Sequence, residues 1–284
     1  MKKRVWIDAD SIVYQAAHQA YNGADNDLAE AESLAEEGEE LGLDDSTSNE
    51  AEEAQRSFMS RINSLMSECK AEAKRKNYEI FDDPMIVITV KKSLEACSKL
   101  EQNFRYEIMA NIEDDTVKGY KANRVGMEVP RGLNEVYEWA LGLPNTFCMS
   151  GVEADDVVVY YGLQGDIVCA LDKDVLKSLP YAYDYYHSKW TAYSEVERKR
   201  FPYYQCITGD TGDGLRGVYR VGPKKADAAL AGKHTEYEMW TAVVKQYIGK
   251  NQTLEEAIAT MRAVRMDQWT EKGGLVLWTP PTKD

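Results

Sequence analysis

The 284-residue sequence has few of the features that build zinc sites, disulfide frameworks or membrane spans. Its five cysteines are scattered without a CxxC pair, and its three histidines show no ligand spacing, so a zinc site is not expected. No stretch approaches the roughly 18 apolar residues of a membrane-spanning helix. An odd number of scattered cysteines is typical of a reducing compartment. We therefore expect a cytoplasmic protein that does not associate with membranes.

Basic residues are almost absent from residues 24–56, which hold thirteen acidic residues and a single base, Arg56. This segment carries −12 of the net charge of −14, so the rest of the chain is close to neutral. An acidic overall charge is therefore no argument against a polyanionic partner for the rest of the chain. The segment also has few large apolar residues, and we expect a solvated helix or a flexible insertion there rather than a functional site.

Outside that segment, short apolar runs alternate with helical patterns. The runs that read as buried strands are 5–7, 85–90, 146–149 and 166–171. The helical patterns lie at 11–20, 54–77, 133–143, 235–248 and 253–266, with a tyrosine-rich hairpin at 181–194 and a last strand at 275–278. This alternation predicts an α/β fold with a doubly wound, mainly parallel sheet.

Acidic residues recur where the predicted strands end or helices begin. The carboxyl ends of parallel strands meet at one edge of such a sheet, where ligands usually bind. Carboxylates packed together raise one another's pKa unless a cation neutralises them, and oxygen-only clusters suit Mg²⁺ or Mn²⁺. Turn residues and an acidic first helical turn are the purely structural alternatives. The acids at these positions are Asp8, Asp10, Glu153, Asp155, Asp156, Asp172, Asp174, Asp210 and Asp213.

Two short basic clusters suit a phosphate backbone. Lys121 and Arg124 are three positions apart, so both can face one strand of phosphates, while Tyr120 offers a ring for stacking. Further along, Gly222-Pro223 is typical of a helix start, where free N–H groups beside Lys224-Lys225 can bind phosphate. A solvated polar helix and a plain helix–turn–helix corner are the respective alternatives.

The chemistry that follows from these residues is metal-assisted hydrolysis, since no Ser-His-Asp or Cys-His set is apparent. Two divalent ions about 4 Å apart can generate a hydroxide and stabilise both the attacking and the leaving oxygen of a phosphodiester. In this interpretation the acids bind the metals and the basic residues bind the nucleic-acid backbone.

Five motifs together resemble the flap endonuclease (5′-nuclease) family, closest to bacteriophage 5′→3′ exonucleases and the 5′-nuclease domain of bacterial DNA polymerase I. They follow the family's order over about residues 5–230. Each motif is weak alone, and the ordered set is specific. The motifs are Ile7-Asp8-Ala9-Asp10, Gly119-Tyr120-Lys121-Ala122-Asn123-Arg124, Glu153-Ala154-Asp155-Asp156, Leu171-Asp172-Lys173-Asp174, and Gly209-Asp210-Thr211-Gly212-Asp213 with Gly217-Val218-Tyr219-Arg220-Val221-Gly222.

The resemblance implies a Rossmann-like (PIN-like) nuclease core at 1–205, with a helical arch at about 91–131, and a helical duplex-binding region at 206–284. It implies a 5′→3′ exonuclease or flap endonuclease acting on DNA with 5′ ends or flaps, or on an RNA–DNA hybrid. Such a protein would be a monomer working with replication proteins in phage DNA replication or recombination, in the host cytoplasm.

The resemblance also assigns roles to residues. Two Mg²⁺ or Mn²⁺ ions would be bound by Asp8, Glu153, Asp155, Asp156, Asp172, Asp174 and Asp213, with Asp210 as a companion acid. Lys121 and Arg124 would steer the scissile phosphate from the arch, and Tyr120 would stack on a base. The segment 217–225 would grip duplex DNA as a helix–turn–helix that also holds K⁺, through Gly217, Val221, Gly222, Lys224 and Lys225.

The chain departs from the family after the second strand, where Val90-Lys91-Lys92 replaces an aspartate that Asp114 or Asp115 could supply. Two other functions stay open. One is a DNA-structure-binding relative that has lost turnover with this acid. The other is a haloacid-dehalogenase-type phosphatase with Asp8 as the phosphorylated nucleophile, which leaves the 120–124 and 153–156 motifs unexplained. A related RNA-cutting nuclease would keep the acids without needing the 217–225 grip.

Overall fold

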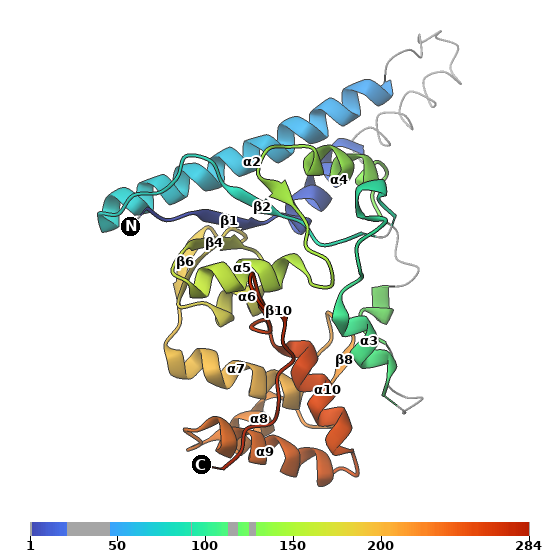
Figure 1. Ribbon diagram of the computed structural model, residues 1–284, viewed down its shortest axis with the longest axis vertical. Coiled ribbons are helices and arrows are strands. Elements are labelled where there is room, and N and C mark those ends of the chain that lie inside the picture. Colours follow the sequence, from blue (N-terminus) through green and yellow to red (C-terminus); the bar gives the residue numbers. More distant parts are fainter. Residues whose placement is uncertain (1, 22–45, 92, 113–118, 125–128, 284) are drawn as a thin grey trace, which may run out of the picture.

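A six-stranded sheet lies at the centre of the computed structural model, which describes residues 2–21, 46–91, 93–112, 119–124 and 129–283 (Figure 1). The strand order is β3-β2-β1-β4-β5-β6, and all neighbours are parallel except the β5–β6 hairpin. This confirms the predicted doubly wound, mainly parallel α/β sheet. The strands are β1 Val5–Asp8, β2 Met85–Val87, β3 Thr146–Phe147, β4 Ile167–Ala170, β5 Tyr181–Asp184 and β6 Lys189–Ala192.

Strand β1 is central and is buried on both faces because its side chains alternate between two cores. Val5 and Ile7 pack with the helix at 10–21, with α2 (Ser46–Lys76) and with α4 (Leu133–Leu141). Trp6 points to the other face, against α5 (Ala154–Leu163) and α6 (Lys173–Ser178). A strand covered on both faces has a continuous run of apolar residues, and this run is why the strand could be predicted from the sequence.

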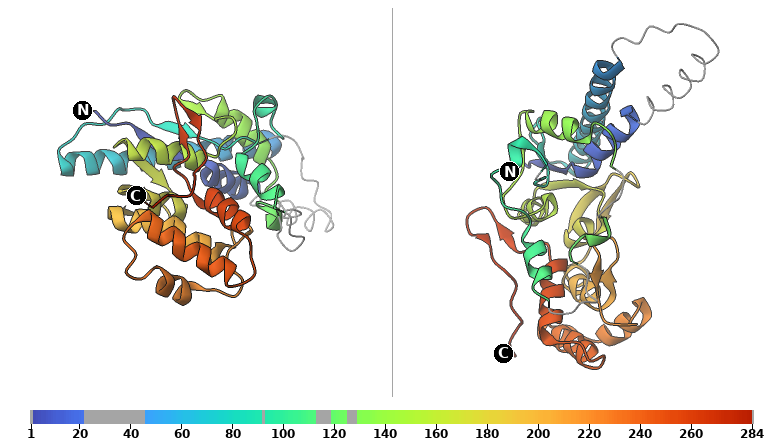
Figure 2. Two further views of the ribbon diagram at one scale, coloured as in Figure 1. Left: turned by 60° about the horizontal axis from the view of Figure 1, so that its bottom comes forward. Right: turned by 90° about the vertical axis from the view of Figure 1, so that its right-hand side faces the viewer.

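Four further helices pack together at the opposite end of the molecule from α2 (Figure 2). They are α7 Glu195–Thr208, α8 Pro223–Leu230, α9 Glu236–Ile248 and α10 Leu254–Val264. Helix α10 starts at a capping box, in which Thr253 and Glu256 each bond to the other's backbone N–H. The domain boundary predicted at 205/206 falls inside α7, so the two regions share a helix.

Short elements link these layers. Helix α3 (Phe104–Ala110) packs against α10, and the 3-10 turns η1 (Glu95–Cys97) and η2 (Ala122–Arg124) lie before and after it in sequence. Two small antiparallel ladders complete the fold. They pair β7 Gly209–Asp210 with β8 Leu215–Arg216, and β9 Trp269–Thr270 with β10 Gly274–Leu275.

Three predicted segments differ from the structure. The strand at 85–90 ends at Val87, because the backbone N–H of Thr89 bonds to the Asp10 carboxylate instead of a neighbouring strand. The helix at 54–77 begins earlier, at Ser46, and Glu50 in its second turn is buried against Arg131, at 2.7 Å. The last strand stops at Leu275, and Trp278 leaves it to pack against Trp240.

Some predictions fall outside the described residues: most of the acidic segment (24–45), parts of the arch (113–118 and 125–128, with Asp114 and Asp115), and Lys92. Residues 46–56 of the acidic segment form the first turns of α2. In the part of the chain that the structure describes, no helix has the length and apolar character needed to cross a bilayer.

Glu72 of α2 provides a pH-dependent contribution to stability. Its carboxylate accepts two hydrogen bonds from Arg75, at 2.7 and 2.6 Å, and one from the Tyr181 hydroxyl, at 2.5 Å. The hydrogen bonds from Arg75 are the main cause that lowers the pKa of Glu72 from 4.5 to about 2. A lowered folded-state pKa adds stability that is complete above pH 4.5 and is lost as the pH falls to about 2.

We expect Glu72→Gln to lower the free energy of unfolding at neutral pH by about 1 kcal/mol, a modest value because the Arg75 side chain is 64% exposed and water screens the pair. The deficit should shrink as the pH falls from 4.5 towards 2. Urea denaturation across that range measures it, with Glu68→Gln, an exposed acid on the same helix, as the control. A deficit that is constant with pH would contradict the assignment.

Candidate metal and nucleic-acid site

A pocket of about 290 Å³ opens at the carboxyl end of β1, and acids from four distant segments line it. Asp8 ends β1, Asp155 lies in the first turn of α5, Asp172 caps α6 after β4, and Asp213 lies between β7 and β8. The convergence follows from the parallel sheet, whose strands β1 and β4 end side by side. The acids that line the pocket are Asp8, Asp10, Glu153, Asp155, Asp172 and Asp213, six of the nine predicted.

Three of these carboxylates, those of Asp8, Asp155 and Asp172, form no ion pair with the residues that the structure describes, and they repel one another. Burial, followed by the charges of Asp10 and Asp172, raises the pKa of Asp8 to about 7. Burial, followed by the charges of Asp8 and Asp172, raises the pKa of Asp155 well above its usual range. A group of this kind takes up either protons or a cation. The pocket therefore favours binding of a positive charge close to Asp8, Asp155 and Asp172.

Glu153, by contrast, is neutralised by the chain itself. It forms an ion pair with the ammonium group of Lys121 and accepts a hydrogen bond from the Tyr120 hydroxyl, at 2.7 Å. Burial acts to raise its pKa, but the charges of Lys121 and Arg105 outweigh burial and lower the pKa to about 2. Glu153 is thus ionised in the folded protein, and Lys121 occupies the space that faces it.

Asp213 is held in a similar way at the rim. Its Oδ1 lies 2.9 Å from Nη2 of Arg124, and its Oδ2 accepts a 3.1 Å hydrogen bond from the Tyr120 hydroxyl. The backbone carbonyl of Asp213 accepts the N–H of Lys121, at 2.8 Å. The predicted arch residues Lys121 and Arg124 therefore lie at the pocket, each paired with an acid of the predicted metal set.

The donor set suits a hard divalent cation, although its side chains are not arranged around one. Among the residues that the structure describes, no three Asp, Glu, His or Cys side chains form a ready coordination group. The donors are all oxygens, and Oδ1 of Asp174 is buried without a hydrogen-bond partner. Burial, followed by the charge of Asp172, raises the pKa of Asp174 to about 7. A bound divalent ion towards which these carboxylates turn would give Oδ1 of Asp174 a partner and would also remove the repulsion that raises its pKa.

Asp174 and Asp210 form a second acidic group that does not line the pocket. Lys173 lies between them, with its Nζ 2.8 Å from Oδ2 of Asp210 and 3.7 Å from Oδ1 of Asp174. Asp210 also accepts the backbone N–H of Gly212, at 2.8 Å. Asp172 links this group to the pocket through its charge on Asp174. The sequence motif contained Lys173, but its role as the cation between these acids was not predicted.

Asp156 requires a correction, because Arg105 occupies both of its carboxylate oxygens. Nη1 and Nη2 of Arg105 each lie 2.7 Å from an oxygen of Asp156, and Arg105 is fully buried. Asp156 also accepts the backbone N–H of Glu153 in the capping box that starts α5. The acid predicted as a metal ligand therefore fixes the helix that carries Asp155. Arg105 was missed because nothing in the local sequence marks a partner 51 positions away.

Tyr120 also differs from its predicted role. Its ring is only 2% exposed and packs edge-on against Tyr106, with ring centroids 5.2 Å apart. In this structure the ring of Tyr120 therefore offers no face for a base to stack on, and its hydroxyl contacts the two acids Glu153 and Asp213. Where the sequence lacks the family's aspartate, Lys91 lines the pocket beside Thr89, with its ammonium 5.2 Å from the centroid of the Tyr137 ring.

The segment predicted to grip duplex DNA forms a tight turn into α8. A Cβ at Gly217 would lie 2.3 Å from the backbone nitrogen of Gly209, so only glycine fits there. Gly222 is the N-cap of α8 and Pro223 its first residue, and both Lys224 and Lys225 are exposed. Val221 is buried, so its side chain supports the turn and does not face a ligand.

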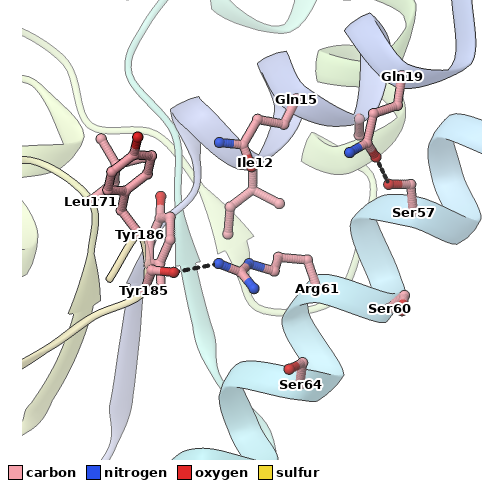
Figure 3. A pocket seen from close by; sticks show the side chains of 11 residues that line it. Ile12, Gln15, Gln19, Ser57, Ser60, Arg61, Ser64, Leu171, Tyr185 and Tyr186 are labelled. Atoms are coloured by element: carbon pink, nitrogen blue, oxygen red, sulfur yellow. Dashed lines mark hydrogen bonds between the residues drawn. The ribbon is translucent and has the colours of Figure 1, made fainter. Parts of the chain in front are cut away.

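A second, polar groove of about 510 Å³ adjoins the pocket, since Leu171 lines both. Figure 3 shows its walls, formed by the helix at 10–21, by α2 and by the residues after β5. Among the described residues that line it, Arg61 is the one that carries a charge. Arg61 donates a 2.6 Å hydrogen bond to the carbonyl of Tyr185, and its Nε is buried without a hydrogen-bond partner in this part of the chain. Ser57, Ser60 and Ser64 line the groove along one face of α2.

Neither a known protein-family profile nor a curated protein sequence matches this chain. Solved structures do. The flap endonuclease of bacteriophage T5, in a complex with DNA and metal ions, is 18% identical, covers 72% of this chain and 81% of its own, and gives a TM-score of 0.50. A zinc-bound T5 5′-exonuclease is 17% identical with the same coverage and a TM-score of 0.49. The first likeness shows that this chain has the fold of a 5′-nuclease.

Proposed function

We propose that this protein is a metal-dependent 5′-nuclease that hydrolyses DNA phosphodiesters at or near 5′ ends and flaps. The observation that carries the proposal is the convergence of unpaired Asp8, Asp155 and Asp172 in one pocket with Lys121 and Arg124 beside them. An acidic pocket that would hold metal ions, with the cations of Lys121 and Arg124 at its rim, suits a substrate that is itself a polyanion. The shared fold with a flap endonuclease solved with DNA and metal ions agrees with this assignment.

Each residue group has a distinct role in this proposal. Asp8, Asp10, Asp155 and Asp172 would hold two Mg²⁺ or Mn²⁺ ions, which supply a hydroxide and charge neutralisation when bound. Lys121 and Arg124 would exchange their present acidic partners for the phosphates on either side of the cut. Arg105 keeps Asp155 in place by anchoring α5 through Asp156.

The finer features of the function belong to the same proposal. We infer that the protein acts as a monomer in phage DNA replication or recombination in the host cytoplasm, beside replication proteins, and that it also accepts an RNA–DNA hybrid. K⁺ would bind at the turn that Gly217 to Lys225 form. The polar groove beside Leu171, with Arg61 in its described lining, would give the nucleic acid a further surface next to the pocket.

A second candidate is a DNA-structure-binding protein without turnover. Lys91 favours it, since this cation lines the pocket where the family carries an acid and reduces the negative charge available to metals. The phosphatase interpretation has less support, because it gives no role to Lys121, Arg124 and Glu153, which line the same pocket as Asp8.

Cleavage of an end-labelled 5′-flapped duplex in Mg²⁺, in Mn²⁺ and in EDTA tests the proposal. Cutting that requires metal would establish the nuclease, and product lengths would separate stepwise trimming from flap removal. Tight binding of the flap without cutting in either metal would instead establish the second candidate. Hydrolysis of small phosphate monoesters would favour the phosphatase.

Lys224→Ala combined with Lys225→Ala is expected to weaken duplex binding. Loss of two phosphate contacts should reduce the slope of log K against log salt concentration by about 2. Fluorescence anisotropy over a salt series measures the slope. The matched control is Lys2→Ala with Lys74→Ala, two exposed lysines at the amino-terminal edge of the sheet, away from the pocket. An unchanged slope in the first variant would place the phosphate grip elsewhere.

A further inference from the structure

Four of the five cysteines, which are scattered in the sequence, lie in two contact pairs. The sulfurs of Cys97 and Cys148 are 3.6 Å apart, and those of Cys69 and Cys169 are 3.4 Å apart. The partners are separated by 51 and 100 residues, so neither pair can be predicted from the spacing of the cysteines in the sequence. The proposed nuclease function uses neither pair.

The two pairs differ in their access to solvent. Cys69 and Cys169 are fully buried in the core between α2 and β4. Cys97, at the end of η1, is also buried, but Cys148, just after β3, is partly exposed. Of the two pairs, the Cys97–Cys148 pair is therefore the one that solvent approaches, through Cys148, while the other pair is fully buried.

The backbone around Cys97 and Cys148 is already held together. Gly151 donates its N–H to the carbonyl of Glu101, at 3.1 Å, and Phe104 donates its N–H to the carbonyl of Gly151, at 2.9 Å. A disulfide S–S bond is about 2.05 Å long, so the sulfurs need to approach by only about 1.5 Å from their separation of 3.6 Å. Formation of the bond therefore requires a local shift of this size at the partly exposed Cys148.

We propose that Cys97 and Cys148 form a redox-modification site, which a small-molecule disulfide such as oxidised glutathione closes into a protein disulfide. The Cys148 thiolate attacks one sulfur of oxidised glutathione, forms a mixed disulfide and releases a glutathione thiolate, which takes up the proton lost by Cys148. The Cys97 thiolate then attacks the Cys148 sulfur and displaces the second glutathione. Two protein thiols are oxidised, and one small disulfide is reduced to two thiols.

The environment of Cys148 determines the rate of the first step of this thiol–disulfide exchange. Burial, together with its contact to Cys97, raises the pKa of the Cys148 thiol to about 12, so little attacking thiolate is present at neutral pH. The first step is therefore slow. Once a mixed disulfide has formed, however, Cys97 lies in contact and closure is favoured. The disulfide would therefore form during sustained exposure to oxidised glutathione and not during brief exposure.

The disulfide would link the end of η1 covalently to the segment between β3 and Glu153. Residues 148–151 run from β3 to the N-cap of α5, where Glu153 faces the carboxylate pocket. Closing a loop between positions 51 residues apart restricts the unfolded chain, and we expect Tm to rise by about 5 °C or more in the oxidised form.

Prolonged incubation of the folded, full-length protein with oxidised glutathione tests the proposal. Alkylation and intact mass would show the loss of two free thiols, and peptide mapping would show a link between Cys97 and Cys148 only. Cys97→Ser should stop at a glutathione adduct on Cys148, whereas Cys69→Ser, the matched control, should close the bond normally. Reduction with dithiothreitol should reverse the rise in Tm.

Three results would overturn the proposal. The first is a folded protein that keeps all five thiols under these conditions. The second is a link between Cys69 and Cys169 that forms as readily as the one between Cys97 and Cys148, since reactivity would then not follow access. The third is a glutathione adduct on Cys148 that persists with Cys97 present.

Discussion

Asp155→Asn is expected to lower metal-dependent cleavage of a 5′-flapped duplex by about a thousandfold or more, because a metal ligand's share of transition-state stabilisation is several kcal/mol. Asp172→Asn should have a similar effect. Binding of the duplex in EDTA should change little, since neither residue is a cation that contacts phosphate. Time courses with end-labelled strands, together with anisotropy in EDTA, measure both quantities.

The same substitution should leave the protein folded and at least as stable as the wild type without metal. Burial and the charges of Asp8 and Asp172 raise the pKa of Asp155, so a neutral amide removes repulsion. Asp83→Asn, an exposed acid at the other edge of the sheet, is the control for both readouts. Unfolding of Asp155→Asn, or cleavage at the wild-type rate, would contradict the site assignment.

Arg105→Met is expected to lower the free energy of unfolding by about 3 to 5 kcal/mol, because it leaves Asp156 buried and without its counter-charge. Urea denaturation in EDTA measures the loss directly. The double variant Arg105→Met with Asp156→Asn should recover part of the stability, because the unpaired charge that Arg105→Met leaves on Asp156 is then removed.

A double-mutant cycle over Arg105 and Asp156 separates the interaction between the two residues from the loss of side-chain packing. We expect strong coupling in the cycle, and Asp156→Asn alone should destabilise the chain although Asp155→Asn does not. A stability within about 1 kcal/mol of wild type for Arg105→Met would mean that the interior tolerates the free carboxylate.

The different roles of the adjacent acids Asp155 and Asp156 show which parts of the site could be predicted from the sequence. The strand at Val5–Asp8 and the helix after Glu153 were predictable, because buried parallel strands and helix starts leave local patterns. Convergence of Asp8 and Asp172 at one edge followed from the topology of a parallel sheet. The sequence alone therefore located most of the pocket.

The division of roles among the acids was not predictable, because it depends on contacts distant in sequence. Asp156 meets Arg105, and Glu153 meets Lys121, across separations that no local pattern reports. Tyr120 offered a ring for stacking beside Lys121 and Arg124, which can face one phosphate strand, but in the structure Tyr106 packs against that ring. Likewise, the extent of α2 depended on the burial of Glu50 against Arg131.

Helix α7 has a further consequence, since it belongs to both the sheet layer and the helical end of the molecule. It packs against α6 as well as α9, and the chain that leaves it passes within a few residues through Asp210 and Asp213 to the turn before Lys224. A rigid connection of this kind fixes the distance between the carboxylates and the lysines. In the proposed nuclease, this distance would set the position of the cut relative to a duplex bound at Lys224 and Lys225, whatever the length of the flap.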